Sequence, residues 1–149
     1  MGVKGSILVE GGGCPLSLVI SGANVNDHLL LEATLKAIVV ERPAPSTDCP
    51  QHLCLDKGYD NELSRQIAAA HSYVAHIKRI GEEKQDDLGE KTHPARRWVV
   101  ERAWGWLSRW RGLLVRWEKK PENYLATMKL ASAFLWIRRA VSAGSTILG

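Results

Sequence analysis

The sequence predicts an α/β fold with a mixed sheet and flanking helices. Three observations lead to this prediction: two aliphatic, β-branched-rich runs are joined by glycines, strand and helix signals then alternate, and two helical segments close the chain. The predicted order is β-β-α-β-α-β-α-α, an antiparallel hairpin followed by alternating units. The 149 residues, 45% of them hydrophobic, are enough for one domain with its own core.

The hairpin is predicted at the start of the chain. Residues 6–10 and 16–20 are the strand-like runs, and Gly11–Gly13 between them permit the positive φ angles of a tight turn. Pro15 cannot donate a backbone hydrogen bond, which suits a strand edge. The loop after the hairpin ends at Asn26–Asp27, and either residue suits the N-cap of the first helix.

The later elements follow from the same signals. Apolar residues at helical spacing predict helices over residues 29–40, 60–71, 96–114 and 121–139. Short apolar runs predict strands over residues 51–55 and 73–77. Irregular composition predicts a loop over 78–92, an extended piece over 115–117 and a frayed tail over 142–149, which leaves residues 1–141 as the domain.

Several classes of protein are excluded by composition. No apolar stretch approaches the roughly 18 residues of a membrane-spanning helix, and the first residues lack the pattern of a secretory signal. The three cysteines form no C-x-x-C pair, and an odd number argues against a disulfide framework. A reduced, cytoplasmic compartment is therefore expected.

Positive charge and tryptophan are concentrated in one stretch, residues 91–120. It holds nine Lys or Arg residues and two acids, so it carries +7 in a chain whose net charge is +4. Five of the six tryptophans lie in the same stretch. Arginine interleaved with large aromatic rings suits a polyanion, because cations neutralise phosphates and rings stack on bases. The alternative is a helix whose tryptophans are core and whose arginines are merely solvated.

Asp56 is the first candidate for chemistry. It ends the strand predicted over residues 51–55, and ligands and metals gather at the carboxyl ends of strands in α/β sheets. A carboxylate on a rigid strand end, exposed to water, suits a hard cation. The alternative is an ordinary turn aspartate, with Asp60 as a helix N-cap.

Glu101 is the second candidate, on the helix rich in tryptophan and arginine. It could pair with Arg97 or Arg102 on the helix surface. It could equally be a ligand offered towards the strand end that holds the first acid. Arg97, Glu101, Gly105 and Ser108 share one side of this helix, and the small Gly105 would allow that side to approach a sheet or ligand closely.

These features occur together in one known family. The motifs are Asp56-Lys57-Gly58-Tyr59-Asp60, Arg97-Trp98-Val99-Val100-Glu101-Arg102, Trp106-Leu107-Ser108-Arg109 and Lys119-Lys120-Pro121-Glu122-Asn123-Tyr124. In order and spacing they resemble the C-terminal half of bacterial insertion-sequence transposases of the DDE type, of the insertion sequence family 5 kind. Residues 11–15 and 21–24 match as well, so the resemblance covers nearly the whole chain.

The resemblance implies an RNase H-like fold and catalysis by three carboxylates. Asp56 matches the second of them and Glu101 the third. Arg97 matches the arginine of a signature that runs Tyr, Arg, Glu, Lys. The chain departs from that signature at Pro94, which fills the tyrosine position, and at Ser108, which fills the lysine position with Arg109 next to it.

The resemblance also implies that the first aspartate lies on a strand ahead of the hairpin, and this chain offers no match to it. Such a strand would lie between the hairpin and the strand over residues 51–55. Its removal would leave backbone groups unpaired on both sides. We therefore expect an incomplete transposase domain, either a degraded copy or the downstream frame of a two-frame transposase that needs an upstream-frame polypeptide.

The family's reaction implies specific cofactors and partners. Two Mg²⁺ ions, with Mn²⁺ as an alternative, would serve cleavage at the ends of the element and transfer of the freed 3′-hydroxyl to target DNA. The implied partners are terminal inverted repeats, target DNA and further copies of the chain, in the cytoplasm at the nucleoid and not at a membrane. The side chains expected to bind DNA are Arg97, Arg102, Arg109, Arg111, Arg116, Lys119 and Lys120.

Three functions are compatible with this sequence. The first is the catalytic half of a DDE transposase. The second is a DNA-binding remnant without catalysis, which occupies element ends or inhibits a full-length transposase. The third is a metal-dependent nuclease of the same fold, which would nick DNA without joining a 3′ end to target.

Overall fold

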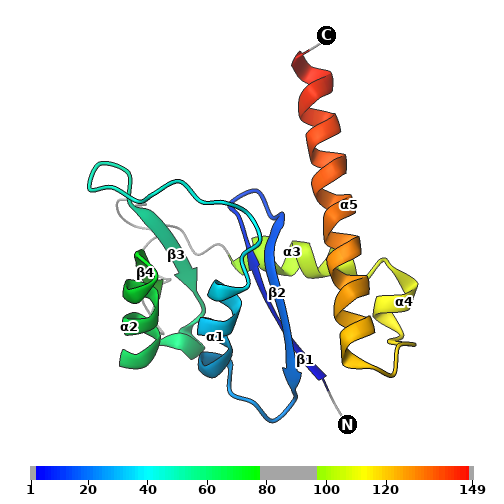
Figure 1. Cartoon of the computed structure of the whole chain (residues 1–149), viewed down its shortest axis with the longest axis horizontal. Coiled ribbons are helices and arrows are strands. Elements are labelled where there is room, and N and C mark those ends of the chain that lie inside the picture. Colours follow the sequence, from blue (N-terminus) through cyan, green and yellow to red (C-terminus); the bar gives the residue numbers. More distant parts are fainter. Residues whose placement is uncertain (1–2, 78–96, 148–149) are drawn as a thin grey trace, which may run out of the picture.

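A computed structural model describes residues 3–77 and 97–147 of the chain (Figure 1). Its elements in chain order are β1 (Val3–Val9), β2 (Pro15–Gly22), α1 (Asp27–Lys36), β3 (Gln51–Leu55), the 3-10 turn η1 (Lys57–Tyr59), α2 (Glu62–Ala70), β4 (Tyr73–Ile77), α3 (Arg97–Leu107), α4 (Arg111–Leu114) and α5 (Pro121–Ile147). This is a mixed α/β fold with flanking helices, as the sequence predicts. The expected loop over residues 78–92 lies outside the described residues.

The strands form two separate sheets rather than the single mixed sheet expected. β1 and β2 pair antiparallel as the predicted hairpin, with Gly5 opposite Ile20 and Ile7 opposite Leu18. β3 and β4 pair in parallel, with Leu53 opposite Ala75. Within the described residues, β1 pairs with no strand other than β2, and β3 with none other than β4. The sheet is therefore interrupted between β1 and β3, because no described strand bridges the backbone groups along those two edges.

Helices cover both faces of the β1–β2 hairpin. On one face lies α1, where the Ser17 hydroxyl donates to the Thr34 carbonyl oxygen at 2.7 Å. On the other face, Leu18 packs with Leu107 of α3 and Met128 of α5. The hairpin is thus the middle layer of this part of the molecule, and α5 runs on past it towards the C-terminus (Figure 1).

Two apolar clusters make up the core. The cluster around Leu18 and Met128 joins the hairpin to the C-terminal helices. The second cluster contains Leu31 of α1, Leu53 of β3 and Ala68 of α2. Leu8 of β1 packs against this second cluster, so the two sheets share a layer of apolar side chains although they share no backbone hydrogen bonds.

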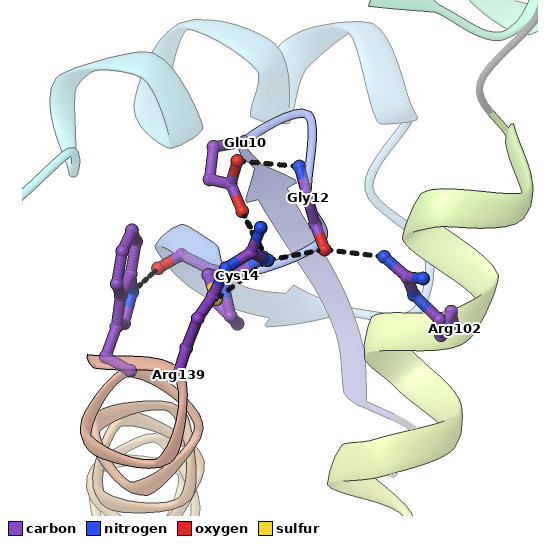
Figure 2. A network of polar contacts seen from close by, with 7 residues as sticks. Glu10, Gly12, Cys14, Arg102 and Arg139 are labelled. Carbon is purple, nitrogen blue, oxygen red and sulfur yellow. Dashed lines mark hydrogen bonds and ion pairs between the residues drawn. The ribbon is translucent and has the colours of Figure 1, made fainter. Parts of the chain in front are cut away.

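A polar network fixes the turn of the hairpin (Figure 2). The Glu10 carboxylate accepts hydrogen bonds from the backbone N–H of Gly12 at 2.6 Å and of Cys14 at 3.0 Å, and it pairs with Arg139 of α5 at 3.2 Å. The Gly12 carbonyl oxygen accepts from Arg139 at 2.8 Å and from Arg102 of α3 at 2.5 Å. Two arginines that follow Gly12 by 90 and 127 residues in the sequence therefore hold the hairpin turn in place.

The ionisation of Glu10 links this turn to the stability of the fold. Burial raises the pKa of Glu10, but the Cys14 and Gly12 N–H groups and the charge of Arg139 outweigh burial and hold this pKa below its ordinary value of 4.5. A carboxyl whose pKa is lower in the folded state stabilises the fold above its unfolded pKa, and this stabilisation is lost as the pH falls through the folded pKa.

The Glu10→Gln variant is therefore expected to be less stable than the unaltered chain at neutral pH. Because the charged form of Glu10 makes the difference, the gap in stability between the two proteins should be smaller at about pH 3 than at neutral pH. Urea unfolding at both pH values measures it, with Glu41→Gln, in an exposed loop, as the control. An equal gap at both pH values would show that the charge of Glu10 contributes nothing.

Gly5 of β1 allows a close approach that a larger residue would obstruct. A Cβ atom at this position would lie 2.8 Å from Cη2 of Trp104 in α3. We expect Gly5→Ala to lower the free energy of unfolding by about 1–3 kcal/mol, as overpacking does in other cores. Gly112→Ala in α4, where an added Cβ meets nothing within 4 Å, should be neutral or stabilising in the same urea titration. Equal stability of both variants would contradict the close packing of Trp104 on β1.

The predicted end of α1 and the predicted N-cap of α2 are wrong. α1 ends at Lys36 rather than at residue 40, and its N-cap residue Asn26 makes no side-chain capping bond. α2 is capped by Asn61, whose side chain accepts from the Ser64 N–H at 2.8 Å. Asp60, the predicted cap, instead pairs with Arg65 at 2.6 Å. Adjacent Asp and Asn residues are both good caps, so the sequence alone does not distinguish them.

The predicted helix over residues 96–114 is two helices. α3 ends at Leu107 and α4 begins at Arg111, with the Ser108 hydroxyl bonded to the Gly105 carbonyl oxygen at the break. Serine competes in this way for backbone groups and disfavours the continuation of a helix. The break allows Leu113 of α4 to join the core cluster of α5.

The C-terminal part of the chain differs in two further places. Of residues 115–117, predicted to be extended, 115 and 116 form a turn in which Arg116 has a φ of 46°. α5 continues beyond residue 139 to Ile147, so residues 142–147 are helical where a tail was expected. The segment after Pro121 contains no further proline, and a single glycine costs a helix only about 1 kcal/mol.

Two further findings concern the cysteines and the long helices. Cys14, Cys49 and Cys54 are all free thiols, as the sequence predicts. Among the helices that the structure describes, none is both long and apolar enough to cross a membrane.

Candidate active site

Asp56 lies where the sequence places it, directly after the last residue of β3. Its side chain is exposed. One carboxylate oxygen, Oδ1, accepts a hydrogen bond from the Lys57 N–H at 2.7 Å and caps the turn η1. The carboxylate is therefore oriented by the backbone that follows it while it remains in contact with solvent.

A tyrosine and a second aspartate lie close to Asp56. Burial raises the pKa of the Tyr59 phenol, and the nearby charges of Asp27 and Asp56 raise it further. Asp27, in the first turn of α1, pairs with Lys4 of β1 at 2.6 Å. Lys4, Asp27, Tyr59 and Asp56 thus form a polar group at one edge of the two sheets, where β1 begins and β3 ends.

The sequence pattern does not mark Lys4, Asp27 and Tyr59 as parts of this group. It indicates Asp27 only as a helix cap and Tyr59 only as a turn residue. Their proximity arises because α1 crosses from the hairpin to η1, and no local sequence pattern reports such a crossing. The one available signal was the Tyr59 ring within the Asp56 motif itself.

Glu101 lies on the exposed side of α3. The buried side of this helix is formed by Val99, Ala103 and Leu107. Gly105, expected to allow a close approach, has nothing within 4 Å of an added Cβ, so the approach predicted on its side of the helix is absent among the described residues. The close approach of α3 to a strand occurs at Gly5 instead.

The structure assigns Asp56 and Glu101 to different packing units. α3 packs mainly on β1 and α5, whereas β3 packs on β4 and shares its cluster with α1 and α2. Convergence of the two acids on one ion therefore stays a prediction. Among the described residues there is no group of three or more His, Cys, Asp or Glu side chains placed to hold a metal ion.

The chemistry of Asp56 nevertheless fits a magnesium ligand. Its Oδ1 is oriented by the Lys57 N–H, and the group is an exposed hard-oxygen donor on a rigid strand end. Mg²⁺ in nucleic-acid enzymes is commonly held by one or two protein carboxylates together with water and substrate phosphates. Asp56 therefore has the chemistry of one such carboxylate ligand.

The basic side chains predicted to bind DNA are not equivalent. Arg102 is half-buried, lies over the rings of Trp98 at 4.7 Å and Trp106 at 5.4 Å, and donates to the Gly12 carbonyl oxygen. It therefore joins α3 to the hairpin turn. Arg116 is also half-buried and lies 5.6 Å from the centre of the Tyr124 ring.

The other predicted cations divide between exposed and undescribed side chains. Arg109, Arg111, Lys119 and Lys120 are exposed. The side chain of Arg97 lies outside the described residues, and so does Pro94, the departure from the family signature. The exposed members of the predicted set thus lie around α4 and the turn before α5.

The tryptophans are divided between core and surface. Trp104 packs on the core cluster of the hairpin. Trp98 and Trp117 are 55% and 67% exposed. Trp104 therefore fits the structural explanation, whereas the two exposed rings present accessible surface, although Trp98 also lies against Arg102.

Comparisons with known proteins agree with one another. The chain matches the family described as "Transposase DDE domain" over residues 1–136. It is 32% identical over 144 residues to a Burkholderia cepacia protein named "Putative transposase for insertion sequence element IS402". That match covers 93% of this chain and 66% of the relative, so the chain spans a little under two thirds of the relative's length. A comparison with solved structures gives no significant match.

Proposed function

Because the chain belongs to the transposase DDE domain family, we propose that it supplies the second and third carboxylates of a metal-dependent DNA transposase. The reaction is cleavage of the ends of an insertion sequence and transfer of the freed strand into target DNA. One observation carries the proposal: within a family match over residues 1–136, Asp56 lies exposed and oriented at the end of β3.

The proposal includes an RNase H-like sheet completed by one more strand. The edges of β1 and β3 that face away from β2 and β4 have no described strand partner, and both strands contribute to one apolar cluster beside α1. A strand between them would pair both edges and could bring the first catalytic carboxylate beside Asp56. An upstream-frame polypeptide is the partner proposed for this strand.

Asp56 and Glu101 are the proposed metal ligands. With the first carboxylate also present, the site would hold two ions, either Mg²⁺ or Mn²⁺. These ions would activate the attacking oxygen and stabilise the leaving oxygen. The residues around Asp56 prepare the site. Lys4 compensates the charge of Asp27, and Tyr59, whose pKa is raised by burial and by the charges of Asp27 and Asp56, places a neutral phenol beside Asp56.

DNA is the proposed substrate and partner. Exposed cations around α4 and the turn before α5 would neutralise backbone phosphates of the terminal inverted repeats and of target DNA, and Trp98 and Trp117 offer accessible rings. Two copies of the chain on paired ends would form the active assembly. An enzyme with this substrate would be found in the cytoplasm with the nucleoid.

A plasmid assay tests the proposal. The substrate is a supercoiled plasmid that carries the coding sequence with its flanking DNA, incubated with the protein and Mg²⁺. Metal-dependent cleavage and joined products are expected, and a chelator should remove both. Nicking without joining would instead indicate a metal-dependent nuclease. Affinity for DNA without cleavage, also in the presence of the proposed upstream polypeptide, would contradict the catalytic proposal.

A DNA-binding remnant is the second candidate. The observation that favours it is the interruption of the sheet between β1 and β3, because a catalytic centre lacking one carboxylate would bind metal weakly. Such a protein would occupy element ends and inhibit a full-length transposase. Inhibition of that enzyme by both the unaltered chain and Asp56→Ala, without cleavage by either, distinguishes this function from catalysis.

A further inference from the structure

A cavity of about 600 Å³ lies between the open end of the hairpin and the turn that leads into α5. Val3, Ile20 and Pro121 contribute apolar surface to its wall. Ser21, Arg116 and Lys119 contribute polar and charged surface. This volume is within the range of pockets that hold small organic groups.

One cation of the cavity, Arg116, has an unusual backbone conformation. Arg116 has a φ of 46°, a left-handed conformation that favours glycine, and its guanidinium lies beside the Tyr124 ring. Strained non-glycine residues persist where the surrounding structure enforces them, often at ligand sites. Pro121 begins a helix of 27 residues, whose N-terminus adds partial positive charge to the same wall.

One acid also lines the cavity. The carboxylate of Glu118 accepts a hydrogen bond from the Asn123 side chain at 3.3 Å, which directs one of its oxygens towards the first turn of α5. The lining then carries two cations and one acid, and an anion is the ligand that this balance favours.

The cavity lies at the same edge of the sheets as Asp56. Val3 lines the cavity on the face of the hairpin that α5 covers, and the next residue, Lys4, points to the opposite face, where it pairs with Asp27. Asp27 and Asp56 both act on Tyr59. Figure 1 shows the start of β1, the end of β2 and the start of α5 together on the lower side of the molecule. A DNA strand that passes the start of β1 would therefore meet the cavity on one face of the hairpin and the Lys4–Asp27 pair on the other.

We propose that this cavity binds one sugar-phosphate unit of the DNA strand that reaches Asp56. Arg116 and Lys119 bind the phosphodiester, and Val3, Ile20 and Pro121 contact the deoxyribose. The inference rests on the proposed function and adds a defined contact to it. Free inorganic phosphate shares the same anionic chemistry, so the experiment separates the two sources.

The test compares two charge reversals on the same part of the chain. Lys119→Glu changes a residue of the cavity, and Lys129→Glu makes the same change of charge at an exposed position of α5 that does not line it. Binding of a labelled DNA duplex is measured by fluorescence anisotropy over a range of salt concentrations. Lys119→Glu should weaken binding about tenfold at 0.1 M salt and reduce the salt slope by about one, while Lys129→Glu changes binding less than about threefold.

Inorganic phosphate is the probe for the alternative source. Its addition, followed by the NMR shifts of the Ser21, Gly22 and Lys119 amides, reports occupancy of the cavity without DNA. Shifts with phosphate combined with equal effects of the two reversals on DNA would make this a free-anion site and overturn the proposal. Equal effects without shifts would overturn it as well. In either case, normal DNA affinity of the unaltered chain would leave the proposed function unaffected. Absence of that affinity would contradict both the proposed function and the phosphate-binding cavity.

Discussion

The Asp56→Asn and Glu101→Gln variants are each expected to cleave DNA at least about a hundredfold more slowly than the unaltered chain in Mg²⁺. Each change removes one charged ligand, and stabilisation of the transition state by a bound metal amounts to several kcal/mol, where about 1.4 kcal/mol corresponds to a factor of ten in rate. The affinity for DNA should be nearly unchanged, since neither acid is proposed to bind phosphate. Plasmid cleavage and anisotropy measure the two effects separately, with the proposed first-strand polypeptide present.

Asp48→Asn is the matched control for these variants. Asp48 is an exposed acid in the loop before β3, outside the motifs of both proposed ligands, and its replacement removes the same charge. Cleavage that survives in either Asp56→Asn or Glu101→Gln at the rate of Asp48→Asn would exclude that acid from catalysis.

Addition of a complementary strand is expected to stabilise this chain more than any single substitution. The part of the Burkholderia cepacia relative outside the match provides a candidate polypeptide, because the match covers only 66% of that protein. If a strand from it pairs with both β1 and β3, a complex should form, and the melting temperature should rise by about 5 °C or more. Calorimetry with and without the added polypeptide measures this rise.

A variant of β3 tests where the added strand binds. Cys54 of β3 is exposed, and Cys54→Pro removes its backbone N–H from the strand. Val74→Pro makes the same kind of change in β4. In the proposed complex the added polypeptide does not pair with β4. Both variants lose stability alone, so the measured quantity is the further rise on addition of the polypeptide. Loss of that rise in Cys54→Pro with retention in Val74→Pro is expected, and the opposite pattern would place the added strand elsewhere.

The strands were the most predictable part of this fold. Residues 51–55 and 73–77 form β3 and β4 with the predicted bounds, and the glycine turn places the hairpin correctly. In each case a short apolar run between turn residues carries the information locally. The interruption between the two sheets could not be predicted from such runs, because strand pairing is a property of residues distant in sequence.

Helix ends were less predictable, because tertiary contacts decide them. The apolar pattern continues through residues 96–114, yet the chain breaks after Leu107 and allows Leu113 to pack against α5. Arg116 adopts a left-handed conformation for which an arginine gives no sequence signal. Both features shape the region around the proposed phosphate cavity.

The candidate site was predictable only in part. Asp56 could be located because a strand end precedes a turn, which is a local feature. Lys4 and Asp27 could not, since their pairing depends on the position of α1 across the hairpin. The role expected of Gly105 belongs instead to Gly5, because α3 presents Trp104 and not its glycine to β1.

The shared-cation claim is central, and paramagnetic broadening by Mn²⁺ tests it most directly. NMR spectra of the chain are recorded during a titration with Mn²⁺, which broadens amide signals near the bound ion. If Asp56 and Glu101 hold one ion, the amides around residues 56–60 and 99–103 should broaden together, and Asp56→Asn should weaken both effects at once. Broadening confined to one of the two segments, or broadening near Glu101 that persists unchanged in Asp56→Asn, would contradict the account.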